Sequence, residues 1–330
     1  MGETLSHNIS STIAMPGVNQ KTPSQGPQEP YRRPQADNNQ TTAPPQLQSP
    51  VRLPVNQLFS VHGRTAICTG VTGGIGFELC AALAEAGADI VSIQLPNDPA
   101  GPRLQEMVVV FGRSFKSFEC DVADSKSLRA CFVSIWAAGV EPAILLNAAG
   151  VNQRGSMEDL TDDDIDKVSG VIVPSSHRLH GSLLTTPKVL AINLKASFVT
   201  CQEFAKKSFE KGRPGKIINI GSMTSFIGMY NVSAYASSKG GILQMTKAFS
   251  NELAPRGIQV NCICPGYIKT PLTEALVKDK SYNDFIMSRT PAMRWGEPKD
   301  LRGALIFLAS PASDFITGVP IIVDGGMLGK

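Results

Sequence analysis

Apolar and polar positions divide the chain into two regions. Residues 1–54 are rich in Pro, Gln, Asn, Ser and Thr and show almost no apolar periodicity. A segment of this composition cannot bury enough apolar surface to offset the entropy that it would lose on ordering. We therefore expect a disordered N-terminal tail over residues 1–54 and a folded domain over residues 55–330.

Short apolar runs alternate with helix-like segments from Gly63 onward. The runs predict β-strands at residues 65–68, 88–93, 144–147, 216–220, 258–263 and 320–323. Nearly continuous apolar strands separated by helices are typical of a parallel sheet that helices cover on both faces. The pattern predicts one α/β domain, a doubly wound parallel sheet of the Rossmann type, with ligands beyond the carboxyl ends of the strands.

Composition and charge exclude several classes of partner. The 330 residues are 42% apolar, enough for a sizeable core, and their formal net charge is only +3. Because no block of Lys or Arg stands out, neither nucleic acid nor a membrane surface is an expected partner. No run is long and apolar enough to span a bilayer, and the N-terminus lacks an apolar secretory region. We expect a cytoplasmic protein.

The cysteine and histidine residues do not predict a metal site. The seven cysteines include no Cys-x-x-Cys pair, and Cys262 and Cys264 lie in an apolar run, which favours buried strand side chains. His177 and His180 have no helix to align them and no carboxylate or cysteine ligand beside them. The odd, unpaired cysteine count fits a reducing compartment.

A glycine-rich turn follows the first predicted strand and precedes the helix-like run at residues 77–87. Glycines permit a tight turn and let backbone N–H groups approach a pyrophosphate, which the helix N-terminus also attracts. The turn predicts a dinucleotide site that includes Gly70, Thr72, Gly74, Ile75 and Gly76. An ordinary turn is the alternative, and residues further along the chain decide between the two.

Three polar residues downstream suggest alcohol–ketone chemistry. Tyr235 and Lys239 are four positions apart in a predicted helix and therefore share one face. The pKa of a free tyrosine is about 10, and a nearby ammonium group would lower it. The phenol could then exchange a proton with a substrate oxygen while hydride moves to or from a nicotinamide. Ser222, just after a strand, could orient the same oxygen.

Each of these residues alone would be unremarkable, but their combination resembles the short-chain dehydrogenase/reductase family, in its single-domain branch, over residues 58–330. The resemblance implies an NAD or NADP cofactor and a catalytic Asn193, which holds a water in a proton relay with Lys239. It implies that Tyr235 and Lys239 also contact the cofactor. Further cofactor residues implied by the family's motifs are Asp121, Val122, Asn147, Ala148, Ala149, Gly150, Pro265, Gly266, Ile268 and Thr270. Ala148 departs from the family's Asn-Asn-Ala-Gly pattern.

The nucleotide preference is less marked. The second strand ends at Gln94, a predicted cofactor residue, without the acidic residue that binds a ribose 2′-hydroxyl in NAD enzymes. The glycine turn also lacks the Arg or Lys that often marks NADP enzymes. The missing basic residue favours NAD over NADP.

The C-terminal half is similar to sugar-acid dehydrogenases of this family, namely 2-dehydro-3-deoxy-D-gluconate (or 2-deoxy-D-gluconate) and gluconate 5-dehydrogenases. The similarity lies in residues 216–226 and 294–298. Arg154 could bind a substrate carboxylate bidentately beside Ser222 and Tyr235, or it could be a solvated loop residue. The alternatives are a 3-oxoacyl or other carbonyl reductase and a catalytically impaired dinucleotide-binding protein. The family resemblance implies a homo-oligomer, a tetramer or a dimer.

One segment, residues 169–188, interrupts the family pattern and has two prolines, two glycines and no helical period. Deleting residues 168–188 joins Lys167 to Val189 and restores the family's sequence pattern before Asn193. We hypothesise that the segment is a translated intron, because Val and Ser codons can spell a donor site and a Lys codon can end in AG. A true surface loop is the alternative, since long loops cost little in closure entropy.

Overall fold

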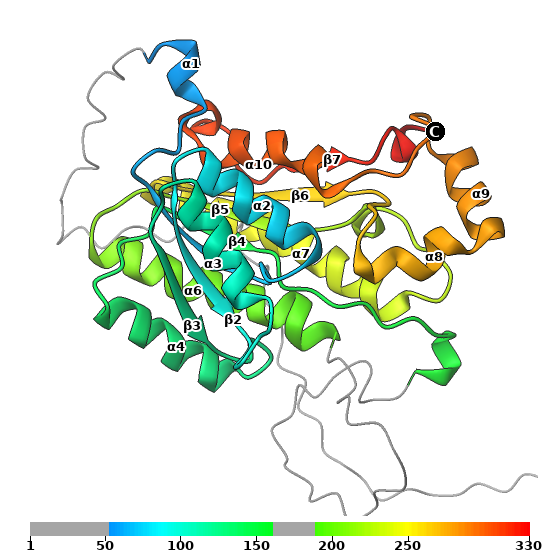
Figure 1. Ribbon diagram of the computed structural model, residues 1–330, viewed down its shortest axis with the longest axis horizontal. Coiled ribbons are helices and arrows are strands. Elements are labelled where there is room, and N and C mark those ends of the chain that lie inside the picture. The colour runs from blue at the N-terminus through cyan, green and yellow to red at the C-terminus, as the bar shows by residue number, and fades with distance from the viewer. Residues whose placement is uncertain (1–52, 161–188) are drawn as a thin grey trace, which may run out of the picture. The chain divides into compact units, whose positions relative to one another are not determined.

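The computed structural model describes residues 53–160 and 189–330. Seven parallel strands form one sheet between two layers of helices (Figure 1), which confirms the predicted fold class. The predictions of a disordered tail and of an irregular insertion fall almost wholly outside the described residues. The strands are β1 Thr65–Thr69, β2 Asp89–Gln94, β3 Phe115–Glu119, β4 Ile144–Asn147, β5 Gly215–Ile220, β6 Ile258–Pro265 and β7 Pro320–Val323.

The strand order creates a switch point at the centre of the sheet. The order is β3-β2-β1-β4-β5-β6-β7, so successive strands are added to one side of β1 and then, from β4, to the other. Thr69 and Asn147, the last residues of β1 and β4, pair in register. Ligands of doubly wound sheets bind beyond the carboxyl ends of strands at such a reversal.

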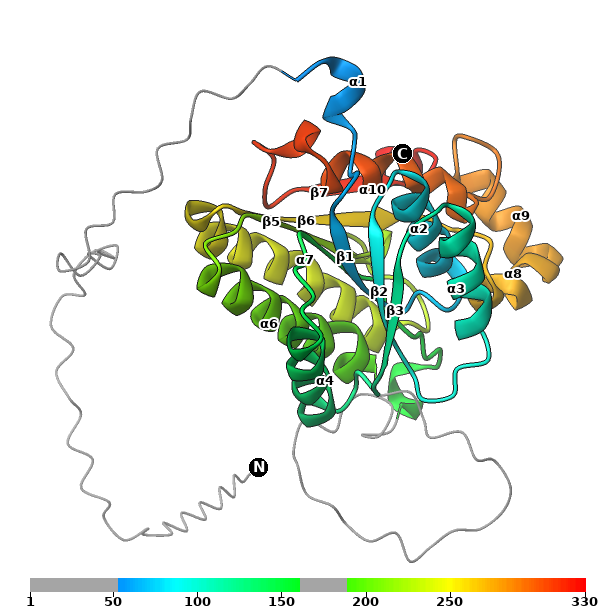
Figure 2. The ribbon, with the colours of Figure 1, turned by 60° about the vertical axis from the view of Figure 1, so that its left-hand side comes forward.

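Helices cover both faces of the sheet (Figure 2). One apolar cluster joins the sheet to α2, α3 and α10, and the other joins it to α4, α6 and α7. These helices span Gly74–Glu85 (α2), Gly101–Val110 (α3), Ser125–Ala137 (α4), Ala196–Glu210 (α6), Ser233–Leu253 (α7) and Arg302–Ala309 (α10). Further helices are α1 Val55–Leu58, α8 Glu274–Lys278 and α9 Lys280–Arg289.

Large apolar side chains fix the position of the helices on the sheet. Phe132 of α4 and Phe204 of α6 are fully buried, and burying a phenylalanine contributes roughly 1.5–3 kcal/mol. The Phe204 ring packs over the first residue of β5, where a Cβ on Gly215 would lie only 2.7 Å from the ring. Truncating Phe204 to alanine would therefore cost about 3–5 kcal/mol of folding free energy.

All six predicted strands are present, but β3 is an addition that the apolar pattern did not predict. It is an edge strand that pairs only with β2, and Lys116, Ser117 and Glu119 are exposed. A strand with so few buried positions gives no continuous apolar run. The apolar pattern did not predict helices α8 and α9 either, because they have few buried residues and little periodicity.

The remaining helical segments that the structure describes are short 3₁₀ or π helices. Across residues 53–160 and 189–330, no helix combines the length and the apolar character needed to cross a membrane. In the same ranges, no group of three or more His, Cys, Asp or Glu residues could hold a metal ion. Cys262 and Cys264 are buried in β6, as predicted.

Candidate active site

The predicted glycine turn lies at the carboxyl end of β1 and leads into α2. Gly70 and Gly74 have φ values of +66° and +55°, a region that favours glycine. A Cβ on Gly76 would lie 2.0 Å from the carbonyl oxygen of Gly70. Thr72 is partly buried in the turn, and Ile75 packs against the core. The turn is therefore too tight for side chains at its key glycines.

The segment after β4 packs directly against this turn. The backbone N–H of Ala148 donates to the Thr69 carbonyl oxygen at 3.2 Å, and that of Ala149 donates to Thr69 Oγ1 at 3.3 Å. A Cβ on Gly70 would lie 2.4 Å from the Ala149 backbone. The predicted cofactor residues Ala148 and Ala149 thus lie against the glycine turn.

Asn147 has a structural position within the sheet. Its Nδ2 donates to Asn219 Oδ1 of β5 at 2.9 Å, and its Oδ1 accepts from Thr200 Oγ1 of α6 at 2.7 Å. Asn219 in turn donates to Thr246 of α7 at 3.0 Å. This buried network joins β4 and β5 to two helices beneath the site.

The segment after β6 returns to the same edge of the sheet. Gly266 follows Pro265, the last residue of β6, and its N–H donates to the Val323 carbonyl oxygen at 3.0 Å. Ile268 is buried, and a Cβ on Gly74 would lie 3.8 Å from Thr270 Cβ. The segment that includes Ile268 and Thr270 therefore borders the glycine turn, as the family's motifs imply.

The predicted residues for the adenosine half lie at the ends of β2 and β3. Gln94 Oε1 accepts from Ser92 Oγ at 3.2 Å, and its amide lies where Gly101 leaves space. Asp121 accepts from the N–H of Ala123 at 2.9 Å, and Val122 packs against the core. A cavity beside Gln94 is lined by Asn97, Asp98, Pro99, Gly101, Pro102, Gln105, Phe115, Ser117 and Glu119.

The predicted proton-transfer residues come from β5 and α7. Tyr235 and Lys239 share one face of α7, with Lys239 Nζ 5.7 Å from the centroid of the Tyr235 ring. Ser222 follows β5 directly, and the Lys239 ammonium donates to the carbonyl oxygen of Ile220, the last residue of that strand, at 2.7 Å. The structure therefore brings α7 against the end of β5.

Lys239 also borders the segment after β4. A Cβ on Gly150 would lie 3.5 Å from Lys239 Nζ and 3.5 Å from Asn193 Oδ1. Gly150 follows Ala149, which contacts Gly70. The glycine turn, the end of β4 and the reactive face of α7 are therefore contiguous.

Burial shapes the protonation of both α7 residues. Burial lowers the pKa of Lys239 to about 8, while the Cys262 and Cys264 sulfurs oppose this change. Burial raises the pKa of Tyr235, and the Ser222 hydroxyl opposes that rise. Sequence reasoning expected a neighbouring ammonium to lower the tyrosine pKa, whereas in this structure burial outweighs the Ser222 hydrogen bond and raises that pKa.

Asn193 lies in a π-helical turn, Ala191–Lys195, that precedes α6. Its Oδ1 accepts from the N–H of Val151 at 2.9 Å, and its Nδ2 donates to the Val151 carbonyl oxygen at 3.0 Å and to Ser238 Oγ at 2.9 Å. Ser238 Oγ donates to the Tyr235 carbonyl oxygen at 2.7 Å. Isolated π turns are frequent at functional sites, and this one joins Asn193 to α7.

Arg154 lies beside an aromatic cluster that sequence reasoning did not find. Its guanidinium carbon lies 5.5 Å from the centroid of the Tyr282 ring, and Arg154 is exposed. Tyr282 and Tyr267 share a hydroxyl–hydroxyl hydrogen bond of 2.9 Å, and Tyr267 packs edge-on against Trp295. These residues come from distant segments, so no local motif marked them.

The Arg154 loop also contacts the loop before α7. The N–H of Gly155 donates to the carbonyl oxygen of Asn231 at 3.2 Å. Tyr267 Oη donates to Met229 Sδ at 3.6 Å. The arginine and the tyrosine pair therefore lie beside the segment that leads to Tyr235, on the carboxyl side of the sheet.

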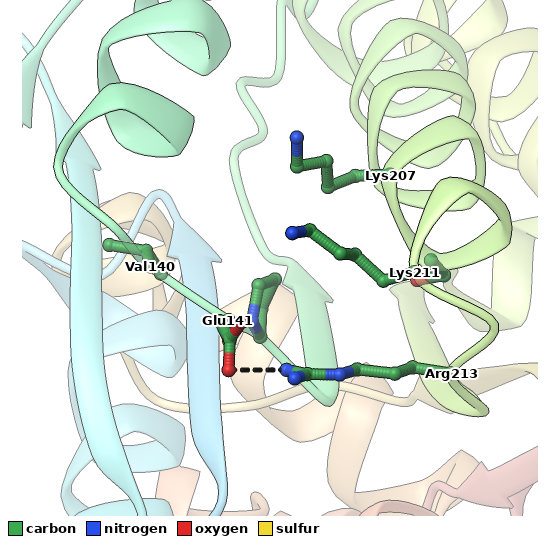
Figure 3. Close-up of a pocket in the computed structure, with 7 residues that line it drawn as sticks. Val140, Glu141, Lys207, Lys211 and Arg213 are labelled. Carbon is green, nitrogen blue, oxygen red and sulfur yellow. Dashed lines mark ion pairs between the residues drawn. The ribbon is translucent and has the colours of Figure 1, made fainter.

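A second pocket lies at the amino ends of the strands, opposite the glycine turn (Figure 3). Its Glu141 pairs with Arg213 at 2.5 Å, and Lys207 and Lys211 extend into the same space. Glu141 and Arg213 precede β4 and β5, so they lie at the amino ends of these strands. This pocket is therefore separate from the site at the carboxyl ends.

The fold, the glycine turn and the Ser222–Tyr235–Lys239 arrangement together define a class of enzyme. A family model for short chain dehydrogenases matches residues 64–281. The chain belongs to this family.

Relatives with assigned activities match almost along their whole length. The 2-dehydro-3-deoxy-D-gluconate 5-dehydrogenase of Pseudoalteromonas atlantica is 36% identical over 272 residues, covering 82% of this chain and 98% of the relative. The 5-keto-D-gluconate 5-reductase of Escherichia coli strain K12 is 34% identical over 277 residues, covering 83% and 99%. A gluconate 5-dehydrogenase from Burkholderia cenocepacia J2315, solved in complex with NADP and tartrate, has a TM-score of 0.73 at 35% identity and covers 83% of this chain and 98% of that one.

Proposed function

We propose that this protein is an NAD(P)-dependent oxidoreductase that interconverts a secondary alcohol and a ketone on a gluconate-type sugar acid. The observation that carries the proposal is the contiguity of Tyr235 and Lys239 with the glycine turn through Gly150 and Ala149. A proton-exchanging pair beside a dinucleotide turn is the arrangement that hydride transfer requires. The names of the relatives support the choice of substrate class.

The glycine turn fits a bound pyrophosphate. Gly70 and Gly76 leave no room for side chains because protein backbone already fills that space, whereas a Cβ on Gly73 would meet no atom of the described part of the chain within 4 Å. The helix α2 begins at Gly74 without a side-chain cap, so its first N–H groups can serve an anion. Gly70, Thr72, Gly74, Ile75 and Gly76 would hold the phosphates, and the nicotinamide supplies the hydride acceptor or donor when bound.

Four side chains divide the remaining work. Ser222 orients the substrate oxygen through its hydroxyl, and Tyr235 exchanges a proton with that oxygen. Lys239, held by the Ile220 carbonyl, places a positive charge beside the tyrosine. Asn193, which borders Gly150 together with Lys239, holds the water of the proton relay.

The raised pKa of Tyr235 keeps its phenol protonated at neutral pH. A protonated phenol can donate to a ketone oxygen, so reduction proceeds from the protonation state that burial favours. Oxidation needs the phenolate. The positive charge of an oxidised nicotinamide would stabilise that phenolate and partly reverse the effect of burial.

Arg154 is the proposed carboxylate receptor. A guanidinium can bind a carboxylate through two parallel hydrogen bonds, and the Tyr282 ring supports the Arg154 side chain from one side. The hydroxyls of Tyr282 and Tyr267 lie beside it and suit a polyhydroxylated chain. An acyl thioester would instead need an apolar channel, so these polar groups favour a sugar acid over the substrate of a 3-oxoacyl reductase.

The preference for NAD over NADP is proposed on the charges near Gln94. The cavity beside it is lined by the carboxylates of Asp98 and Glu119, and no Lys or Arg of residues 53–160 and 189–330 lines it. Two carboxylates would repel a ribose 2′-phosphate. The Burkholderia enzyme was solved with NADP, so any test of cofactor preference must include NADP as well as NAD.

A homo-oligomer is also proposed. Phe198 of α6 is 44% exposed and contacts Phe249 of α7 at a centroid distance of 4.8 Å. An exposed Phe198 beside a half-buried Phe249 on an adjacent helix suits contact with a second copy of the chain. Light scattering of the purified protein would show a tetramer or a dimer, and a monomer at all concentrations would contradict the proposal.

One screen tests the activity. Purified full-length protein is assayed with NAD and NADP against hexonates, their keto acids, 3-oxoacyl thioesters and uncharged ketones. We expect the highest kcat/KM on a hexonate pair and with NAD. Turnover of acyl thioesters alone would replace the proposed substrate class, and absence of all turnover with intact cofactor binding would favour the impaired dinucleotide-binding alternative.

A further inference from the structure

A single serine hydroxyl joins two members of the proposed catalytic set. Ser222 and Ser225 belong to the same tight turn, in which Ser222 caps the 3₁₀ helix η3, Met223–Ser225. Ser225 Oγ accepts a hydrogen bond from the backbone N–H of Ser222 at 3.3 Å. The same hydroxyl donates to the carbonyl oxygen of Lys239 in α7 at 2.7 Å. The backbone of Ser222 is thereby tied to the backbone of Lys239.

Two contacts therefore hold α7 on the end of β5 at one residue. The Lys239 side chain bonds to the Ile220 carbonyl, and the Lys239 backbone bonds to Ser225. Tyr235 lies one helical turn earlier on α7. The separation between its phenol and the Ser222 hydroxyl consequently depends on how this turn sits on the helix.

Close packing around the Ser222–Ser225 turn limits the positions that the turn can adopt. A Cβ on Gly221 would lie 3.2 Å from Ser225 Oγ and 2.8 Å from the sulfurs of both Cys262 and Cys264. The two sulfurs are themselves 3.6 Å apart and buried in β6. The turn is thus packed against β6, and without the Ser225 hydroxyl its distance from α7 would depend on side-chain packing and on the Lys239 side-chain bond to Ile220.

We propose that Ser225 is a positioning residue, whose hydroxyl sets the distance between the Ser222 hydroxyl and the Tyr235–Lys239 face of α7. This inference rests on the proposed reaction. Ser225 acts through Ser222 and Lys239 and does not itself touch the reacting atoms. Because a misplacement of about 1 Å can cost about 100-fold in rate, one lost hydrogen bond here affects turnover more than folding.

The test uses three variants of the full-length protein. Ser225→Ala removes the bridge, and Ser225→Thr retains a hydroxyl. Ser237→Ala is the matched control, because Ser237 is an exposed serine on α7 between Tyr235 and Lys239. Each variant is measured for kcat and KM with a substrate that the wild type turns over, for cofactor Kd by fluorescence, and for melting temperature.

We expect Ser225→Ala to lower kcat about 10- to 100-fold, with the cofactor Kd within about twofold of the wild type. Ser225→Thr should recover most of the loss, and Ser237→Ala should match the wild type. A wild-type kcat in Ser225→Ala overturns the proposal. So does a loss explained by a weakened cofactor Kd or a large fall in melting temperature.

A second readout needs no substrate. The Tyr235 phenolate is titrated by ultraviolet difference spectroscopy, with Tyr235→Phe as the blank. Because the Ser222 hydroxyl opposes the rise in the Tyr235 pKa, moving Ser222 away should raise that pKa further in Ser225→Ala. An unchanged phenol titration overturns the inference. If sugar acids fail as substrates but the titration shifts, the substrate assignment fails and the positioning role stands.

Discussion

The Lys239 ammonium on α7 donates a 2.7 Å hydrogen bond to the carbonyl oxygen of Ile220, the last residue of β5. This bond holds a buried cation at the carboxyl end of β5. Burial lowers its pKa to about 8, so at neutral pH most of the lysine still carries its charge. The charge therefore remains beside Tyr235 under ordinary conditions.

Replacing Tyr235 by phenylalanine should stop the reaction while leaving the cofactor bound. The change removes the proton-exchanging hydroxyl, and general acid–base groups contribute about 10²–10⁴-fold to rate. We expect kcat to fall by at least about 100-fold with cofactor Kd nearly unchanged. Steady-state kinetics and fluorescence titration measure both, and undiminished turnover would remove the proposed mechanism.

The two directions of the reaction should respond oppositely to pH. Ketone reduction needs the protonated phenol and the charged lysine, so its kcat should fall as pH rises through about 8, where Lys239 loses its proton. Alcohol oxidation needs the phenolate, and the raised pKa of Tyr235 makes that form scarce at neutral pH. Its kcat should therefore rise with pH.

The pH profiles are recorded in both directions across the range from neutral to alkaline. Lys239→Met provides the comparison, because it removes the titrating ammonium and keeps most of the side-chain volume; the quantity followed is its residual rate of reduction. The decline in reduction attributed to Lys239 should disappear in this variant. A decline that persists unchanged would assign it to another group.

Removing Arg154 should affect charged substrates only. Hydrogen bonds to charged groups contribute about 1.5–3 kcal/mol, so Arg154→Ala should raise KM for a sugar acid by about 10- to 150-fold. An uncharged ketone should show no change. Tyr282→Phe is the matched control for the supporting ring, since it keeps the surface that contacts the guanidinium. Equal effects of Arg154→Ala on charged and uncharged substrates would exclude a carboxylate receptor.

Two alanine substitutions in the glycine turn should have different effects. At Gly70, φ is +66° and a Cβ would lie 2.4 Å from the Ala149 backbone, so Gly70→Ala should destabilise the fold by about 1–3 kcal/mol or more. Gly73 has an extended backbone with φ of −161°, and its Cβ would meet no atom of residues 53–160 and 189–330 within 4 Å. Gly73→Ala should keep the wild-type melting temperature and weaken dinucleotide binding alone. Thermal unfolding and cofactor titration separate the two outcomes.

The role of residues 169–188 stays a prediction, because the segment lies outside the described residues. A transcript that lacks codons 168–188 would support the intron hypothesis, and its consistent absence would reject it. Protein with and without residues 168–188 should also be compared in parallel. We expect the shorter form to be the more active one, since the deletion restores the family's sequence pattern before Asn193. Equal activity would favour a true surface loop.

The sequence by itself determined the sheet and the chemistry that is local in the chain. Buried parallel strands need continuous apolar runs, so six of the seven strands were visible in the apolar pattern. Tyr235 and Lys239 share a face because helical spacing requires it. The glycine turn could be predicted from the sequence because its backbone conformations, at Gly70 and Gly74, are ones that other residues avoid.

Only the tertiary structure decided what these elements meet. The edge strand β3 escaped notice because it has too few buried positions to leave a pattern. The contact between Arg154 and Tyr282 joins segments far apart in sequence. The Ser225 bridge joins a turn to a helix 14 residues further on. No local periodicity encodes either contact. The direction of the Tyr235 pKa also depends on burial, which is a property of the packed molecule and not of the residue's neighbours in the chain.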